Sequence, residues 1–220
     1  MIKCCIFDLD GTVLDTITTI THYVNVTLEK HGIDKITVDE CKYFAGNGAK
    51  LLIDRSLASK GITDPDFSAK LLDEYNAAYN AKTFYLTKAF DGIDKLLSDL
   101  KANGIKIAVI SNKPNPTVQP IIDYFFKDTF DVALGGLDGV PLKPDPAVPK
   151  MILSKLGISE TETAWIGDTS VDVETGKNLG VRLNIGVLWG FRKKDELVGA
   201  GADMVVERAD EILTAVLAVK

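Results

Sequence analysis

Histidine and cysteine are scarce in this sequence of 220 residues, which holds two histidines and three cysteines. Cys4 and Cys5 are adjacent and Cys41 stands alone, so neither a disulfide framework nor a zinc ligand set is expected. A metal bound by this chain should therefore take oxygen ligands, which favours magnesium or calcium.

Excess positive charge and long apolar runs are absent as well. Lys and Arg number 25 against 31 Asp and Glu, a formal net charge of −6, whereas binding to nucleic-acid backbones needs a cationic face. No run reaches the roughly 18 apolar residues of a membrane span, and acidic residues follow the first apolar run too early for a secretory signal. The sequence predicts a cytoplasmic protein without nucleic-acid or membrane partners, as a monomer or homodimer.

Short apolar runs alternate with amphipathic segments along the chain. Within these runs apolar and polar residues do not strictly alternate, which is typical of strands buried on both faces of a sheet. Helices are expected between them, one over 91–103 and others opened by Asn115-Pro116 and Asp145-Pro146. This order predicts an α/β fold, a Rossmann-like parallel sheet flanked by helices. The expected strands cover 2–7, 105–110, 132–134, 164–166, 185–188 and 204–206.

The interval between the first two expected strands is much longer than a crossover needs, because helix 91–103 already serves as the crossover. Residues 16–87 are therefore interpreted as an inserted helical domain, and residues 1–15 with 88–220 as the α/β core. Asp64-Pro65-Asp66 is assigned to a proline-broken loop without function. The expected helices of the insertion cover 17–30, 38–44, 49–59 and 67–81.

Asp8 and Asp10 stand at the end of the first expected strand. Side chains two apart on a strand share a face, and parallel sheets bind ligands at the carboxyl ends of their strands. Two neighbouring carboxylates need a cation or a shared proton, which suits chemistry that requires one anionic nucleophile and one acid. The alternative is a turn in which both acids merely cap the next helix.

Three further motifs follow expected strands or precede a helix. Ser111-Asn112-Lys113-Pro114 offers a hydroxyl, an amide and backbone N–H groups that can hold a phosphate, or it is an ordinary turn. Lys143 precedes Pro144-Asp145-Pro146, where proline on both sides of the acid fixes the backbone and holds the lysine beside a helix N-terminus. A cation is structurally unfavourable there, although a solvated lysine also fits. Asp168 and Asp172 are either oxygen ligands for magnesium or caps of the following helix.

In this order, D-x-D-G-T, S-N, K-P and G-D-x-x-x-D resemble the motifs of the haloacid dehalogenase superfamily, in its phosphatase branch. The likeness runs from Asp8 to Asp172, and the insertion resembles the helical (C1-type) cap of that family. Gly46-Asn47-Gly48 and Asn112-Lys113-Pro114 are similar to features of the phosphoglycolate phosphatase-like subgroup. A dehalogenase would lack Asp10, so that branch is disfavoured.

The resemblance implies magnesium-dependent hydrolysis of a small phosphomonoester, phosphoglycolate-like, through an aspartyl-phosphate. Asp8 would be the nucleophile and Asp10 the acid and base. Ser111, Asn112 and Lys143 would bind the phosphoryl oxygens, with Lys143 supplying charge. The implied metal ligands are Asp8, Asp10 through its backbone carbonyl, Asp168 and Asp172, the last as ligand or support. The expected substrate-specificity residues of the cap are Gly46, Asn47, Gly48 and Arg55. Lys50 is, beside Arg55, a second candidate for binding a substrate carboxylate.

Three alternatives stay open. A phosphosugar mutase of the same fold, similar to beta-phosphoglucomutase, would use the same motifs. A receiver-like phospho-acceptor domain also places acids and a lysine around magnesium, but such domains are short and lack an insertion like 16–87. A catalytically idle interaction module is the third. The motifs leave the physiological ester undetermined, because cap loops select it through their shape.

Overall fold

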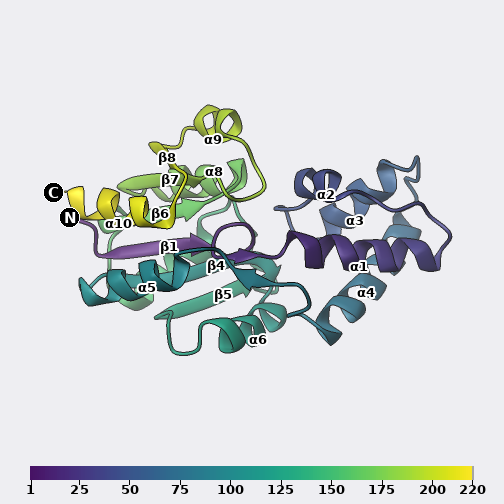
Figure 1. Cartoon of the computed structure of the whole chain (residues 1–220), viewed down its shortest axis with the longest axis horizontal. Helices are drawn as coiled ribbons and strands as arrows, with labels where there is room; N and C mark the ends of the chain where they lie inside the picture. The colour runs from purple at the N-terminus through teal and green to yellow at the C-terminus, as the bar shows by residue number, and fades with distance from the viewer. Residues whose placement is uncertain (220) are drawn as a thin grey trace. The chain divides into compact units, whose positions relative to one another are not determined.

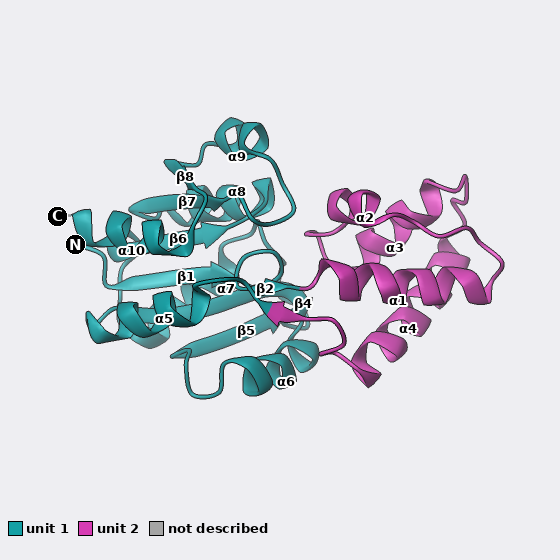
Figure 2. Cartoon of the chain, viewed as in Figure 1, with its two compact units in different colours: residues 1–15, 89–220 teal, residues 16–88 magenta. Residues whose placement is uncertain are grey.

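The computed structural model describes residues 1–219 and divides the chain into two compact units (Figure 2). Unit 1 comprises Met1–Asp15 and Ala89–Lys220, and unit 2 comprises Thr16–Lys88. The chain passes between the units at two short paired strands, β2 (Leu14–Asp15) and β3 (Lys88–Ala89). In the described part of the chain, no helix is both long and apolar enough to cross a membrane.

Unit 1 is built on a six-stranded sheet with the order β5-β4-β1-β6-β7-β8 (Figure 1). Every neighbouring pair is parallel, so the predicted α/β fold is confirmed. Each expected apolar run forms a strand, because continuous burial on both faces requires uninterrupted apolar sequence. The strands are β1 (Cys4–Asp8), β4 (Lys106–Pro114), β5 (Val132–Gly136), β6 (Thr163–Gly167), β7 (Leu183–Val187) and β8 (Met204–Val206).

Strand β1 occupies the middle of this sheet and is buried along its whole length. It pairs with β4 on one side, where Asp8 faces Ile110, and with β6 on the other, where Phe7 faces Ile166. After β5 the chain crosses back past β1 to form β6, so the strand order reverses beside β1. In open parallel sheets, this reversal point at the carboxyl ends of the strands is where ligands bind.

The helices of unit 1 cover the sheet with apolar stripes. Helix α5 buries Ile93, Leu96, Leu97 and Leu100 on one side, and it packs against α10 (Figure 1). Helices α7 and α8 contribute Val148, Ile152, Leu153 and Leu179 to a core cluster with Cys4, Ile6 and Trp165 of the sheet. The helices are α5 (Ile93–Ala102), α6 (Asn115–Phe125), α7 (Ala147–Leu156), α8 (Ser170–Leu179), α9 (Lys194–Ala200) and α10 (Ala209–Ala218), with a 3₁₀ turn η1 (Glu160–Glu162).

Unit 2 is helical, and its helices begin close to the predicted residues. The prediction for Asp64-Pro65-Asp66 is wrong, because this segment starts a helix instead of forming a loop. The Asp64 carboxylate accepts hydrogen bonds from the N–H groups of Asp66 and Phe67 at 2.9 and 3.1 Å, and Pro65 occupies the first helical turn. The helices are α1 (Ile17–Lys30), α2 (Val38–Phe44), α3 (Ala49–Ala58) and α4 (Pro65–Ala81).

Two expectations for the segment after Ile110 are also wrong. Ser111–Pro114 were expected to follow the strand, but they belong to β4, whose pairing with β5 shifts register between Ile110 and Pro114. Asn115 was expected to cap the next helix, but Pro114 precedes that helix and Asn115 lies within it. The Asn115 side chain instead accepts a hydrogen bond from the Gly135 N–H at 3.0 Å and so ties this junction to β5.

Candidate active site

Asp8 is the last residue of β1, at the carboxyl end of the central strand. Its Oδ1 accepts a hydrogen bond from Lys143 Nζ at 2.5 Å, and Asp172 Oδ1 accepts one from the same ammonium at 2.7 Å. All three residues are buried. The ammonium also lies 5.8 Å from the ring centroid of Trp165, within the range of a cation–π interaction. A strand, a loop and a helix thus meet at one buried cation.

Asp172 belongs to the first turn of α8 and has a second set of partners. Its Oδ2 accepts hydrogen bonds from the Thr169 N–H at 3.1 Å and from Thr169 Oγ1 at 2.7 Å, which completes a capping box. The helix-cap alternative for Asp172 and its place in the cluster are therefore both realised. With one oxygen on Lys143 and the other on Thr169, this carboxylate is held in a single orientation.

Asp168 directly follows β6 and is completely enclosed. Thr12 Oγ1 donates to Asp168 Oδ1 at 3.2 Å, and the Phe191 N–H donates to Asp168 Oδ2 at 2.7 Å. The indole N–H of Trp189 donates to the Thr12 carbonyl at 2.9 Å, which joins the loop after β7 to the loop after β1. The sequence motifs assign no role to Thr12 or Phe191.

Glycines permit this close approach around Asp168. Gly11 has φ +89°, a left-handed conformation that other residues adopt only with strain. A Cβ atom there would collide with the Asp168 carboxylate, and a Cβ at Gly190 would collide with Asp168 Cβ and the Gly11 carbonyl oxygen. Both loops can therefore close on Asp168 only because these two positions lack side chains.

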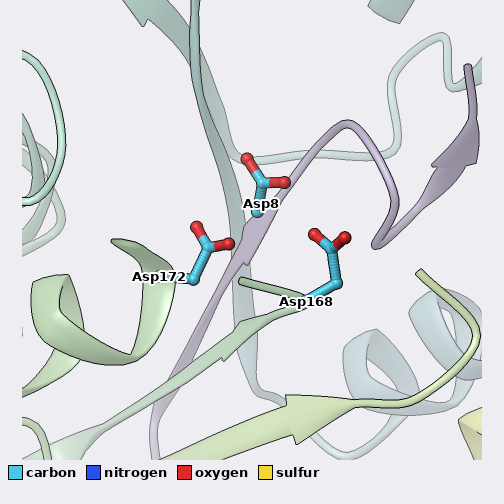
Figure 3. A group of neighbouring side chains, drawn as sticks. All are labelled: Asp8, Asp168 and Asp172. Carbon is cyan, nitrogen blue, oxygen red and sulfur yellow. The ribbon is translucent and has the colours of Figure 1, made fainter. Parts of the chain in front are cut away.

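The carboxylates of Asp8, Asp168 and Asp172 converge from β1, the end of β6 and α8 (Figure 3). One ligand oxygen from each lies within 4.8 Å of the others. Three buried carboxylates with a single lysine between them carry uncompensated negative charge. Their all-oxygen donor set suits a hard dication such as Mg²⁺, so these residues fit the metal that the sequence predicts.

The electrostatics of the cluster lead to the same conclusion. Burial raises the pKa of Asp8 to about 7; Lys143 acts in the opposite direction, and repulsion from Asp172 and Asp10 adds to the rise. Burial, together with the charges of Asp8 and Asp172, also raises the pKa of Asp168 well above its usual range. Burial alone would lower the pKa of Lys143, but the attraction of Asp172 and Asp8 outweighs it and raises that pKa. A bound cation would stabilise the ionised form of Asp8 and Asp168 and so lower both pKa values.

Asp10 lies beside this cluster with different partners. Its Oδ1 accepts a hydrogen bond from Lys113 Nζ at 2.5 Å, and Ser111 Oγ lies 3.4 Å from Oδ2. The side chains of Lys113 and Asp10 are only 13% and 15% exposed. Lys113 belongs to the motif Ser111–Pro114 but has no role assigned from the sequence, although its place two residues after Ser111 was a usable signal.

Asn112 was expected to bind phosphate, but the structure gives its side chain another partner. Asn112 Nδ2 donates to the Lys143 carbonyl at 3.1 Å, and the Lys143 N–H donates to Asn112 Oδ1 at 2.9 Å. Unit 1 therefore brings together Asp8, Asp10, Ser111, Asn112, Lys143, Asp168 and Asp172, every core residue that the motifs predict.

The specificity residues expected in the cap lie in unit 2. Arg55 donates through one guanidinium nitrogen to the Phe44 carbonyl and to Asn47 Oδ1, both at 2.9 Å. Asn47 is flanked by Gly46 and Gly48 at φ +108° and +89°, so Arg55 secures a loop of unusual backbone conformation. Lys50 pairs with Asp54 on the exposed side of α3 at 2.7 Å. Their part in selecting a substrate stays a prediction.

Relatives of this chain carry related names. "Phosphoglycolate phosphatase" from Psychrobacter arcticus is 31% identical over 193 residues, 84% of this chain and 83% of its own. "Phosphoglycolate phosphatase" from Yersinia pestis is 30% identical over 215 residues, 96% of this chain and 91% of its own. Both likenesses extend over most of each protein.

Solved structures agree with this fold. The crystal structure of an inferred phosphoglycolate phosphatase from Lactobacillus delbrueckii subsp. bulgaricus superposes with a TM-score of 0.94 at 31% identity, covering 97% of this chain and 98% of the other. An inferred beta-phosphoglucomutase from Thermotoga maritima superposes at 0.74 over 100% of both chains with 23% identity, which concerns the fold alone. Residues 5–185 match the haloacid dehalogenase-like hydrolase family. The chain is an enzyme that belongs to this family of hydrolases.

Proposed function

We propose that this hydrolase is a magnesium-dependent phosphatase that acts on a small phosphomonoester through an aspartyl-phosphate on Asp8. The observation that carries the proposal is the place of Asp8, buried at the carboxyl end of the central strand. There it touches Lys143 and lies in one cluster with Asp168 and Asp172. The names of the relatives at about 30% identity support phosphoglycolate as the first ester to test.

In the first step, an Asp8 carboxylate oxygen attacks phosphorus, and the bond from phosphorus to the ester oxygen breaks. Asp8 Oδ1 is bound by Lys143, which leaves Oδ2 as the proposed attacking atom. Asp10 gives its proton to the departing alcohol oxygen, so the leaving group departs neutral.

In the second step, water attacks the same phosphorus. Asp10, now ionised, takes a proton from that water, and the bond from phosphorus to the Asp8 oxygen breaks. Inorganic phosphate leaves, and both aspartates return to their starting states. The pair thus divides the work between a nucleophile held by Lys143 and an acid and base held by Lys113.

Positive charge for the phosphoryl oxygens comes from Lys143, with a hydrogen bond from the Ser111 hydroxyl. The Asn112 amide already bonds to the Lys143 backbone, so Ser111 and Lys143 carry the proposed side-chain contacts. Because these groups are fixed before the substrate arrives, they stabilise the developing charge without reorganisation.

Mg²⁺ would be held by Asp8, Asp168 and the backbone carbonyl of Asp10. We assign Asp172 a supporting place, because its Oδ1 binds the Lys143 ammonium and its Oδ2 closes the helix cap with Thr169. The two oxygens of Asp168, in contrast, accept hydrogen bonds from neutral donors. A dication bound there supplies charge that keeps Asp8 ionised and orients the phosphate. Thr12 and Phe191 fix the Asp168 carboxylate from outside, as partners of metal ligands commonly do.

Unit 2 is proposed to act as the cap that selects the ester. The loop Gly46-Asn47-Gly48 is the proposed contact for the leaving group, and Arg55 anchors that loop through Asn47. Anchoring favours selectivity because a fixed loop offers one shape to the substrate.

The experiment is phosphate release from a panel of esters with Mg²⁺: phosphoglycolate, sugar phosphates, nucleotides, pyridoxal phosphate and pyrophosphate. We expect turnover of a small ester, and none for Asp8→Asn in a protein that remains folded by circular dichroism. Retained activity of Asp8→Asn would refute the assignment of Asp8 as the nucleophile. Isomerised sugar phosphate without free phosphate would replace the phosphatase with the mutase, and a stable aspartyl-phosphate without turnover would indicate a receiver-like protein.

A further inference from the structure

We propose that Asn112 is a positioning residue for Lys143, and that it serves catalysis by fixing the lysine backbone instead of binding phosphate with its side chain. This inference rests on the proposed phosphatase function, in which Lys143 stabilises charge on the phosphoryl group. It starts from one contact: the Asn112 amide bonds to both the N–H and the C=O of Lys143, at 2.9 and 3.1 Å.

The segment that carries Lys143 has little regular structure of its own. It connects β5, which ends at Gly136, to α7, which begins at Ala147. Residues Asp138, Gly139, Pro141 and Leu142 of this segment are exposed, whereas Lys143 is 7% exposed. A connection with little regular structure and several exposed residues must therefore place one ammonium between two buried carboxylates.

The ammonium alone is a poor anchor for this purpose. A lysine side chain has four flexible carbon–carbon bonds, and substrate phosphate would compete with Asp8 and Asp172 for it. A reactive group misplaced by about 1 Å costs roughly 100-fold in rate. An anchor at the lysine backbone restricts the origin of the side chain and leaves the ammonium available to the substrate.

Asn112 provides this anchor from the sheet. It lies in β4 beside the central strand, and it is buried at 8% exposure. Its two hydrogen bonds to a single residue fix both the position and the orientation of that peptide segment. Because both the carbonyl oxygen and the amide nitrogen of the side chain are used, replacement by a residue with one polar group cannot reproduce the pair.

A nearby asparagine offers a matched control. Asn178 Nδ2 donates to the Pro144 carbonyl at 3.0 Å, one residue after Lys143, but this bond is exposed. Asn178→Ala removes one side-chain bond to the same segment without touching the Lys143 backbone. We expect Asn178→Ala to keep its activity within about threefold of the unmodified enzyme, because an exposed bond is readily replaced by water.

The test is a double-mutant cycle of Asn112→Ala and Lys143→Met, with kcat and KM measured on the best ester of the panel. We expect Asn112→Ala alone to lower kcat/KM by roughly 10- to 100-fold. In the Lys143→Met background it should cost less than about threefold, since there is no ammonium left to position. Equal losses in both backgrounds would overturn the proposal and identify Asn112 as an independent phosphate ligand.

A second readout does not depend on turnover. Binding of inorganic phosphate with Mg²⁺, measured by calorimetry, should weaken in Asn112→Ala only where Lys143 is present. If Asn112→Ala fails to fold, Asn112→Asp replaces it, because the carboxylate can still accept from the Lys143 N–H while losing the bond to the carbonyl. Phosphate binding that depends on Asn112 in both backgrounds would contradict the proposal, whereas an enzyme that hydrolyses no ester would contradict only the proposed function.

Discussion

Lys113 Nζ lies 2.5 Å from Asp10 Oδ1, so the proposed acid of the reaction is held by a lysine that the sequence motifs left without a role. Both residues are largely enclosed, and Lys113 is anchored in β4, where its N–H bonds to Ser111 Oγ at 3.1 Å. The two aspartates therefore have different partners, because Asp8 is bound by Lys143 and Asp10 by Lys113.

Lys113→Met should lower turnover most for esters whose leaving alcohol needs a proton. The substitution removes the group that orients Asp10, and we expect a loss of roughly 10- to 100-fold with phosphoglycolate. With p-nitrophenyl phosphate, whose leaving group departs as a stable anion, the loss should stay below about fivefold. Lys95→Met, in the exposed pair with Asp99, is the control. The comparison uses kcat/KM, which reports the step that releases the alcohol and not the later attack of water. Equal losses in kcat/KM with both esters would argue against a role through Asp10 in that step.

Gly190→Ala should impair the site because the new methyl group collides with Asp168 Cβ and the Gly11 carbonyl. Overpacking of this kind typically costs about 1–3 kcal/mol, and displacement of Asp168 should weaken Mg²⁺ binding in calorimetry. Gly199→Ala is the matched control, since it lies in α9 with no atom within 4 Å of a new Cβ. The control should be neutral or stabilised by about 0.5–1 kcal/mol. Unchanged Mg²⁺ affinity in Gly190→Ala would exclude this role for the glycine.

Asp8→Asn should raise the melting temperature in EDTA at pH 8. Burial raises the pKa of Asp8 from 3.8 to about 7, so the folded, metal-free protein binds this proton more tightly than the unfolded chain does. Stability is therefore lost as the pH rises through this interval, and the neutral amide avoids the loss. Added Mg²⁺ should reverse the order of the two melting temperatures. The unmodified protein keeps the Asp8 carboxylate, so it binds Mg²⁺ more tightly than Asp8→Asn and is stabilised more. A lower melting temperature of Asp8→Asn in EDTA would contradict the prediction.

Asp131→Asn should destabilise the protein at neutral pH but not in acid. Burial acts to raise the pKa of Asp131, but the bonds from Lys106 at 2.8 Å and the Ile107 N–H at 2.9 Å outweigh it and lower that pKa below 3.8. The stabilisation is present above pH 3.8 and is lost as the pH falls through the lower folded value.

We expect Asp131→Asn to cost about 1 kcal/mol at pH 7, which corresponds to roughly 2–4 °C in melting temperature. The difference should vanish near pH 2. Asp99→Asn, in the exposed pair with Lys95, should cost only about 0.3–0.5 kcal/mol. A difference for Asp131→Asn that persists in acid would show that lost packing, not charge, explains the effect.

Much of the fold follows from local sequence. The apolar runs predict the six strands of the sheet because strands buried on both faces need continuous apolar residues. Helices α1 and α2 begin and end at the predicted residues, because the apolar residues that pack inward recur with helical spacing only within those limits. The misplaced start of α4 shows the limit, because Pro65 favours a helix start after Asp64 as readily as it breaks a loop.

The residues of the candidate site also follow from local sequence, whereas their partners do not. Spacing within each motif was enough to select Asp8, Asp10, Lys143, Asp168 and Asp172 as candidates, because strand ends in a parallel sheet meet at one edge. The partners of these residues were not readable, since Lys113 stands 103 residues from Asp10 and Thr12 stands 156 residues from Asp168. Only the tertiary structure decides which lysine faces which carboxylate, and that Asn112 bonds to a backbone 31 residues away. Such contacts depend on sheet order and loop packing, which local sequence does not determine.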